Sequence, residues 1–220
     1  MQSKKIGLFA TSIFLLAALS GSIRLFQKGP SYYDERLSLF RQSPENADVV
    51  MLGDSITELG NWTELLPSTN VLNRGIKGDT TSGVLKRLDE VIDRHPRTVF
   101  LMIGINDLSL NVPVTVASDN IRTIVREITK SNIRIVWQST LYVTPDYRQS
   151  LNARVKWLNQ SVRDLCINHE ATCLDLNMVL AIDGALSPKN SSDGVHLSER
   201  GYLLWSKAIS RCVSTWETPC

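Results

Sequence analysis

Short apolar runs alternate along this chain with longer segments in which apolar residues recur at helical spacing, and this alternation constrains the fold more than any other feature. Recurrence at i, i+3, i+4 and i+7 predicts amphipathic helices, and short apolar runs predict buried strands. Strands separated by helices favour a parallel sheet with helices on both faces. The predicted strands are residues 49–52, 70–73, 98–103, 133–139 and 171–176, and the predicted helices are residues 81–94, 114–130, 148–169 and the segment from 198 onward.

Length and charge narrow the possibilities further. The chain has 220 residues, and its 24 basic and 22 acidic side chains leave a formal net charge of +2. Such a chain lacks the basic surface that nucleic-acid binding requires. Residues 27–46 are polar and contain Pro30 and Pro44, so we predict a tether there. Residues 47–220 are then predicted to form a single domain.

The N-terminal segment has the pattern of an export signal. Lys4 and Lys5 precede an uncharged, largely apolar run at residues 6–23, which Arg24 closes. The most apolar part of this run matches the hydrophobic region of a signal peptide, and the whole run just reaches the length of a membrane span. Residues 1–26 are therefore predicted to be either a cleaved signal peptide or an uncleaved N-terminal membrane anchor. In both cases the remaining chain is predicted to be exported, to the periplasm or outside the cell.

Two distant segments contain the residue types that nucleophilic catalysis needs. Ser55 follows a predicted strand in the sequence Gly-Asp-Ser, and His196 closes an Asp-Gly-Val-His segment that begins at Asp193. A serine hydroxyl needs an imidazole to take its proton, and the imidazole needs a carboxylate to fix its tautomer and stabilise its cation. Among the three histidines of the chain, only His196 has an aspartate three residues before it. We therefore predict Ser55 as the nucleophile, His196 as the base and Asp193 as the acidic partner.

Two further segments contain candidate hydrogen-bond donors for an oxyanion. Acyl transfer passes through a tetrahedral oxyanion, which positioned N–H groups must bind. Gly75 lies in a turn after the predicted strand 70–73, and Asn106 lies after the predicted strand 98–103. Ser55, Gly75 and Asn106 thus all follow predicted strands, and sites form at the carboxyl ends of parallel strands. We predict that the backbone N–H of Gly75 and the side-chain amide of Asn106 contribute to an oxyanion hole.

In their order along the chain, these segments resemble sequence blocks of the SGNH hydrolases, also called the GDSL esterase/lipase family. The resemblance covers most of the chain after the tether, and it implies an α/β fold. The implied architecture is a flavodoxin-like three-layer αβα sandwich with a five-stranded parallel sheet. It also implies a catalytic triad of Ser55, Asp193 and His196. The implied oxyanion hole consists of the Ser55 backbone N–H together with Gly75 and Asn106.

The departures from the family pattern touch no reacting group. Ile56 replaces the leucine of Gly-Asp-Ser-Leu, and Leu197 follows the histidine where many members have proline. The rival scaffold, the α/β-hydrolase fold, places a glycine two residues after its nucleophile to relieve a strained turn. This chain has Thr57 at that position, which excludes the rival scaffold.

The resemblance is closest to small acylhydrolases and carbohydrate O-acetylesterases, including relatives of platelet-activating-factor acetylhydrolase. It implies a serine esterase that acts on a small acyl ester, with acetyl first, carried by a carbohydrate or a cell-envelope glycan. Three alternatives stay open: a lysophospholipase or short-chain lipid acylhydrolase, an O-acyltransferase, and a non-catalytic binding module on the same scaffold. Four residues after predicted strands line an acyl pocket or belong to the core: Ile76, Leu108, Tyr142 and Val143.

The predicted chemistry needs no cofactor and no metal, and the sequence does not indicate an oligomeric state. Apart from an acyl-ester substrate, the only contact predicted is that of residues 1–26 with a membrane. The cysteines of an exported chain can form disulfides, and four cysteines allow three pairings. Cys166 with Cys173 and Cys212 with Cys220 are the pairings of neighbours, and free thiols are the alternative. Their spacings match no zinc-ligand pattern.

Overall fold

Five parallel strands form the central sheet of the computed structural model, which describes residues 31–43, 45–148, 150–168 and 170–214. The strand order β2-β1-β3-β4-β5 is that of a flavodoxin-like sheet and confirms the predicted fold class. The strands are β1 (Val49–Gly53), β2 (Val71–Gly75), β3 (Thr98–Met102), β4 (Arg134–Gln138) and β5 (Thr172–Leu174).

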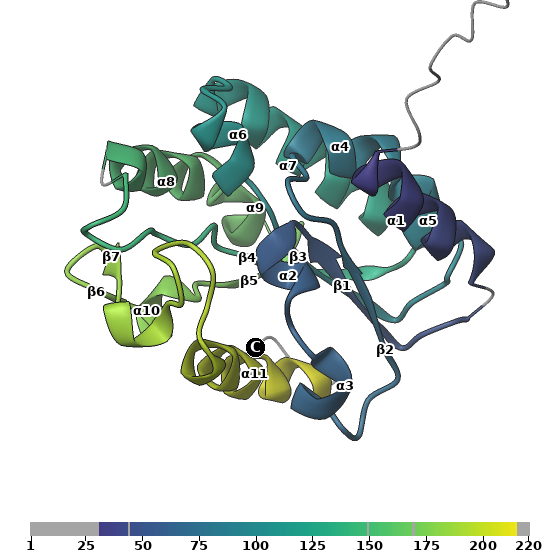
Figure 1. Cartoon of the computed structure of the whole chain (residues 1–220). Helices are drawn as coiled ribbons and strands as arrows, with labels where there is room; N and C mark the ends of the chain where they lie inside the picture. The colour runs from purple at the N-terminus through teal and green to yellow at the C-terminus, as the bar shows by residue number, and fades with distance from the viewer. Residues whose placement is uncertain (1–30, 44, 149, 169, 215–220) are drawn as a thin grey trace, which may run out of the picture.

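Helices cover both faces of the sheet and complete the three layers (Figure 1). One face carries α1 (Tyr32–Gln42), α4 (Thr81–Lys86), α5 (Leu88–Ile92), α7 (Val114–Lys130) and α8 (Ser150–Ser161), and the other carries α3 (Trp62–Leu65) and α11 (Glu199–Ser214). The shorter elements are α2 (Ser55–Glu58), α6 (Ile105–Ser109), α9 (Asp164–Ile167), α10 (Asn177–Leu180), β6 (Ala181–Ile182), β7 (Ala185–Leu186) and the 3-10 helix η1 (Pro188–Asn190).

The apolar patterns of the sequence account for this layering. Strands β1 and β3 are buried along their whole length, because helices cover both sides of the inner strands. Helix α7 has the predicted bounds, and its buried residues follow helical spacing. They are Val114, Ala117, Ser118, Ile121, Ile124, Val125 and Ile128.

The predicted tether contains a helix that packs on the domain, which corrects the predicted boundary at residue 47. Helix α1 begins with a capping box, in which the Ser31 hydroxyl accepts the Asp34 N–H and the Asp34 carboxylate accepts the Ser31 N–H. The side chain of Phe40 is buried. Arg94 donates a hydrogen bond to the Phe40 carbonyl oxygen at 2.9 Å. The polar composition did not predict this helix, because polar contacts such as the hydrogen bond from the Tyr33 hydroxyl to the Gly83 carbonyl oxygen also hold it against the domain.

Two predicted helices are each divided in two. Arg87 ends α4 and precedes α5 with a non-helical backbone (φ −122°, ψ 15°), which breaks the predicted helix 81–94. Its guanidinium is completely buried, and the turn directs it into the interior. The predicted helix 148–169 divides into α8 and α9.

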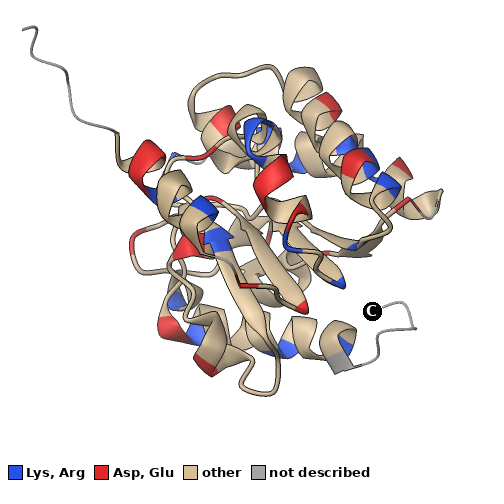
Figure 2. Cartoon of the chain, turned by 90° about the vertical axis from the view of Figure 1, so that its right-hand side faces the viewer, with Lys and Arg blue, Asp and Glu red and all other residues tan. Residues whose placement is uncertain are grey.

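The predicted signal peptide or anchor lies outside the described residues and stays a prediction. Over residues 31–214, leaving aside the three gaps, we found no helix with both the length and the apolar character of a membrane span. Basic and acidic positions are interspersed along the ribbon in Figure 2, in keeping with the nearly balanced charge.

One of the two neighbouring cysteine pairs is joined. A disulfide links Cys166, in α9, to Cys173, in β5. Cys212 is also disulfide-bonded, whereas Cys220 lies outside the described residues. The first pair therefore ties a helix to the edge strand that follows it. Of the two alternatives for this pair, a disulfide and free thiols, the structure has the disulfide.

Candidate active site

Three side chains from distant segments form a continuous hydrogen-bonded chain. Ser55 Oγ lies 2.9 Å from His196 Nε2, and His196 Nδ1 lies 2.6 Å from Asp193 Oδ2. Ser55 begins α2 directly after β1, and the other two residues lie in the loop between η1 and α11. With its proton on Nδ1, His196 donates to Asp193 and accepts the Ser55 hydroxyl proton at Nε2. The structure therefore brings together the nucleophile, base and acid that the sequence predicts.

The acid of this chain is held in its ionised form. Partial burial pushes the pKa of Asp193 upward, but hydrogen bonds from the His196 side chain and from the His196 and Val195 backbone lower it to about 2. The two backbone N–H groups donate to Asp193 Oδ1 at 2.8 Å and 3.0 Å. A carboxylate that stays charged at neutral pH can stabilise the imidazolium that forms when His196 takes a proton.

Short polar contacts fix the loop that carries the base. Ser191 Oγ donates to the His196 carbonyl oxygen at 2.9 Å and accepts the Gly194 N–H at 2.8 Å. The Thr144 N–H donates to the Gly194 carbonyl oxygen at 2.9 Å. Gly194 has a φ of +100°, and a Cβ there would lie 2.9 Å from Tyr147 Cβ, so glycine suits this position. These contacts orient His196 towards Ser55.

Asn106 lies in the first turn of α6, which follows β3. Its Nδ2 donates a hydrogen bond to the Asp79 carbonyl oxygen at 2.8 Å. An amide nitrogen carries two hydrogens, so one remains for a substrate oxygen. The side chain is half-buried, so part of it is accessible.

Gly75 does not occupy the role predicted for it. Its N–H donates to Asn73 Oδ1 at 2.9 Å, so this donor is already engaged. A Cβ at Gly75 would lie 2.2 Å from the Glu58 backbone nitrogen. The glycine is therefore required for the close approach of β2 to α2, and its N–H is not available for an oxyanion.

The next glycine in the same loop has different surroundings. Gly78 is exposed, has a φ of +78°, and follows the turn in which the Asp79 N–H donates to the Ile76 carbonyl oxygen. Within the described part of the chain the Gly78 N–H has no hydrogen-bond acceptor. Gly78 precedes the residue whose carbonyl oxygen binds Asn106. The positive φ and the free N–H that favour Gly78 over Gly75 are visible only in the structure.

Comparison with known proteins agrees with this geometry. The sequence model of the GDSL-like lipase/acylhydrolase family matches residues 51–204. This chain belongs to that family. It is therefore a carboxylic ester hydrolase, and the matched range includes both the nucleophile turn and the loop that carries His196.

Relatives of this GDSL-family chain differ in length and in the activity after which they are named. An N-acylneuraminate cytidylyltransferase of Streptococcus agalactiae is 25% identical over 169 residues, or 76% of this chain, which covers only 38% of that protein. The platelet-activating factor acetylhydrolase IB subunit alpha1 of Rattus norvegicus is 30% identical over 174 residues, 74% of this chain and 73% of that protein. An acetylxylan esterase structure from Geobacillus stearothermophilus has the same fold, with a TM-score of 0.64 at 20% identity over 76% of this chain and 94% of that one.

Beneath the site, the buried side chain of Arg87 contacts residues of three segments of this GDSL-family chain. Arg87 Nε donates to Asp79 Oδ2 at 2.8 Å, and Arg87 Nη2 donates to the carbonyl oxygens of Gly53 at 3.2 Å and Arg74 at 2.9 Å. Gly53 ends the strand before Ser55, and Arg74 lies near the end of β2. No sequence pattern indicates this role of Arg87, because the residue lies within a helical pattern whose other positions predict an uninterrupted helix.

A tyrosine fastens helix α11 to the nucleophile turn. The Tyr202 hydroxyl donates to the Ile56 carbonyl oxygen at 2.8 Å. Burial raises the pKa of Tyr202 well above its usual value, so the hydroxyl remains a donor. Its ring stacks near Trp205, with centroids 6.1 Å apart, and meets Trp62 edge-on at 6.3 Å. The element that follows His196 is thus held against the element that carries Ser55.

The four predicted pocket residues separate into two groups. Ile76, Leu108 and Val143 are at most 1% exposed and belong to the packed interior. For these three the core alternative describes the structure, and they offer no surface to a substrate. Tyr142 is half-buried and lines a cavity that does not include the triad.

Replacing Gly75 by alanine is expected to destabilise the fold. The new Cβ would meet the backbone of Glu58, which cannot move without shifting α2. Overpacking of this kind lowers the free energy of unfolding by about 3 kcal/mol. Gly184→Ala is the matched control, because that glycine has a φ of +74° but no neighbour within 4 Å of an added Cβ. Urea unfolding that shows equal losses for the two variants would contradict the close approach of β2 and α2.

Replacing Asp54 by asparagine is expected to stabilise the protein at alkaline pH. Burial, and then the charges of Asp79 and Asp107, raise the pKa of Asp54 from 3.8 to about 7, despite the hydrogen bond that it accepts from the Ile56 N–H. Because the pKa is raised, the folded state holds the Asp54 proton more tightly than the unfolded state does. The contribution of protonated Asp54 to the free energy of unfolding is therefore complete below pH 3.8 and is lost as the pH rises through about 7.

Asparagine keeps the hydrogen-bond acceptor for Ile56 and removes the charge. Asp54→Asn should therefore gain on the order of a few kcal/mol over the wild type at about pH 8 and much less at about pH 5. Urea unfolding at both pH values measures this difference. A variant whose stability relative to the wild type does not change with pH would show that Asp54 does not titrate in this range.

Proposed function

We propose that this GDSL-family chain is an exported serine esterase that removes a small acyl group, acetyl first, from a carbohydrate or cell-envelope glycan through an acyl-serine intermediate. The hydrogen-bonded chain from Ser55 through His196 to Asp193 is the observation that carries the proposal. The disulfide between Cys166 and Cys173 supports export, because structural disulfides persist in oxidising compartments.

The first half of the reaction acylates the serine. Ser55 Oγ attacks the ester carbonyl carbon while its proton passes to His196 Nε2, and Asp193 stabilises the resulting imidazolium. The tetrahedral oxyanion then collapses as His196 returns the proton to the departing alcohol oxygen. In the second half, water attacks the acyl-serine, gives a proton to His196, and releases the carboxylic acid and the free serine.

The oxyanion hole is proposed to consist of the Ser55 N–H, the Asn106 side chain and the Gly78 N–H. The Ser55 N–H lies in the first turn of α2, where helical N–H groups lack an intrahelical partner. Gly78 replaces Gly75 in this assignment, because the Gly75 N–H is bonded to Asn73 and the Gly78 N–H is not engaged. The hydrogen bond between Asn106 and the Asp79 carbonyl oxygen keeps the second and third donors together.

Two relatives support acetyl as the acyl group. One is a platelet-activating factor acetylhydrolase and the other is an acetylxylan esterase. They differ in the alcohol part of the substrate, which is a lipid in the first and a glycan in the second. The acetylhydrolase is 30% identical to this chain, and for that reason a short-chain lipid ester is the second candidate substrate.

An activity panel on the full chain tests the proposed substrate class. It compares acetylated xylan, acetylated amino sugars, p-nitrophenyl esters of increasing chain length and a lysophospholipid, each with Ser55→Ala as the control. We expect acetate release from an acetylated glycan and a steep decline along the p-nitrophenyl series. A higher kcat/KM for long-chain esters or lysophospholipid than for acetyl esters would favour the lipid candidate and reject the glycan one.

A further inference from the structure

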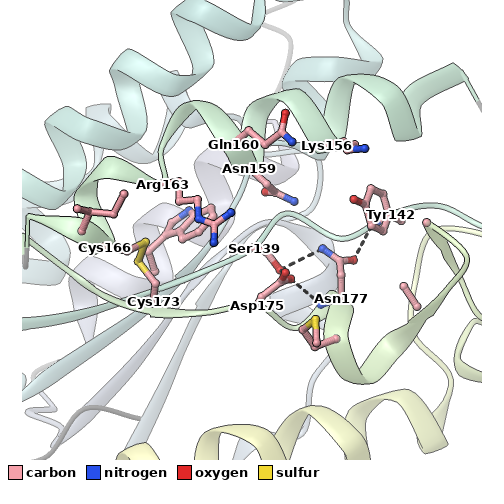
Figure 3. Close-up of a pocket in the computed structure, with 15 residues that line it drawn as sticks. Ser139, Tyr142, Lys156, Asn159, Gln160, Arg163, Cys166, Cys173, Asp175 and Asn177 are labelled. Carbon is pink, nitrogen blue, oxygen red and sulfur yellow. Dashed lines mark hydrogen bonds between the residues drawn. A yellow bond between two sulfur atoms is a disulfide. The ribbon is translucent and has the colours of Figure 1, made fainter.

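The cavity that Tyr142 lines has a volume of about 700 Å³ and lies at the carboxyl ends of β4 and β5, and no residue of the triad lines it. Figure 3 shows α8 residues on one side of it and the segment after β5 on the other. The volume falls within the range of small-molecule sites, roughly 300–1,000 Å³. The proposed acyl chemistry does not use this space.

The floor of the cavity is polar and rigid. The Ser139 hydroxyl donates to Asp175 Oδ1 at 2.7 Å, and the Asn177 backbone N–H donates to the same oxygen at 3.0 Å. Asn177 Nδ2 donates to Ser139 Oγ at 3.1 Å (Figure 3). An acyl chain placed here would desolvate these groups and a carboxylate without compensation. The floor therefore favours a ligand that carries hydroxyl groups.

One wall of the cavity is cationic. Lys156, Gln160 and Arg163 recur at i, i+4 and i+7 along α8 and the turn after it, and their side chains border the cavity. Within the described ranges neither Lys156 nor Arg163 forms an ion pair, whereas the neighbouring Asp164 pairs with Arg122. Asp175 is the one carboxylate among the lining residues of this cavity. Two unpaired cations against one acid favour a ligand that carries negative charge.

Aromatic surface completes the lining. Trp137 and Tyr142 both border the cavity. Trp137 is only 4% exposed, so the half-buried ring of Tyr142 offers most of the apolar face beside the polar floor. The Tyr142 hydroxyl makes no hydrogen bond to another described residue, so it can bind a ligand oxygen. The backbone N–H of Tyr142 donates to Asn177 Oδ1 at 3.0 Å, which fixes this residue against the floor.

We infer that this cavity binds an acidic saccharide unit, a sugar ring that carries a carboxylate. The ring hydroxyls would meet Asp175 and Tyr142, and a carboxylate would meet Lys156 or Arg163, which lie at opposite ends of the cationic wall. An inorganic anion would use the cations alone and leave most of the volume and the aromatic surface without contact. A charged sugar ring uses all three kinds of surface.

The cavity connects with the catalytic loop through one short segment. Tyr142 lies two residues before Thr144, whose N–H binds the carbonyl oxygen of Gly194, next to Asp193. A glycan chain bound at the cavity would thus lie on the side of the triad that carries the acid. The inference rests on the proposed function only in taking the saccharide to be part of the esterase substrate.

Calorimetric titration of full-length Ser55→Ala with a tetrasaccharide of galacturonic acid tests the inference without turnover. We expect binding at least about tenfold tighter than for neutral xylotetraose. Adding Lys156→Ala and Arg163→Ala should weaken uronate binding by about tenfold or more. Adding Lys86→Ala and Lys207→Ala removes the same charge from exposed positions away from the cavity, and should change the affinity less than about twofold.

Four results would overturn the inference: no uronate binding, equal affinity for the neutral tetrasaccharide, equal losses in both double variants, or displacement by an equal concentration of inorganic phosphate. A second measurement separates this inference from the esterase proposal. In a chain that keeps Ser55, the double substitution Lys156→Ala with Arg163→Ala should leave kcat/KM for p-nitrophenyl acetate unchanged. Intact uronate binding in a chain without any esterase activity would refute the proposed function and leave the cavity assignment standing.

Discussion

Replacing Ser55 by alanine is expected to reduce hydrolysis of p-nitrophenyl acetate to the rate seen without protein. Among the described residues, the Ser55 hydroxyl is the nucleophile in hydrogen-bond contact with His196 Nε2, at 2.9 Å. Without it no acyl-enzyme can form, and loss of a serine nucleophile typically lowers turnover by about 10⁴-fold or more. Initial rates at saturating ester, measured on the folded variant, give this comparison.

The control for this variant is Ser82→Ala. Ser82 is an exposed serine in α4, so the same atom is removed from a position away from the site. Its rate should equal that of the wild type. A Ser55→Ala protein that retains more than about a tenth of the wild-type rate would show that another group attacks the ester.

Replacing Asn106 by alanine is expected to lower kcat by about 10²–10³-fold, which is the usual effect of losing one oxyanion donor. The donor acts on charge that develops in the transition state, so KM should change much less than kcat. Steady-state kinetics on p-nitrophenyl acetate measures both constants.

The same substitution removes the hydrogen bond from Asn106 Nδ2 to the Asp79 carbonyl oxygen. The free energy of unfolding should therefore fall by about 1 kcal/mol, too little to unfold the protein. Urea unfolding checks that the kinetic loss does not come from a collapsed site. A kcat within tenfold of the wild type would mean that Asn106 only fastens the loop of Asp79.

The sequence predicted the sheet well because strand burial is a local property. Strands with both faces covered must be apolar along their length, and the runs that became β1 and β3 show this directly. Ser55, Asp193 and His196 were predictable because their chemistry requires particular residue types. The predicted strand before Ser55 placed this residue at the carboxyl end of the parallel sheet, where sites form.

Features that depend on tertiary contacts were not predictable from the sequence. Helix α1 is mostly polar, and its place in the domain shows only in tertiary contacts such as the burial of Phe40 and the hydrogen bond from Arg94 to the Phe40 carbonyl oxygen. Arg87 interrupts a helix because three acceptors in the interior receive its guanidinium. Which glycine of residues 75–78 offers its N–H depends on the Asn73 side chain, whose contact with Gly75 no sequence pattern reveals.

Covalent labelling with a fluorophosphonate tests most directly whether folding makes Ser55 a nucleophile through His196 and Asp193. Mass spectrometry of the labelled full chain should show a single adduct, located on Ser55. The adduct should be absent from Ser55→Ala and should form far more slowly on His196→Ala. An unlabelled wild-type chain would favour a non-catalytic binding module, and an adduct that persists in Ser55→Ala would contradict the assignment of the nucleophile.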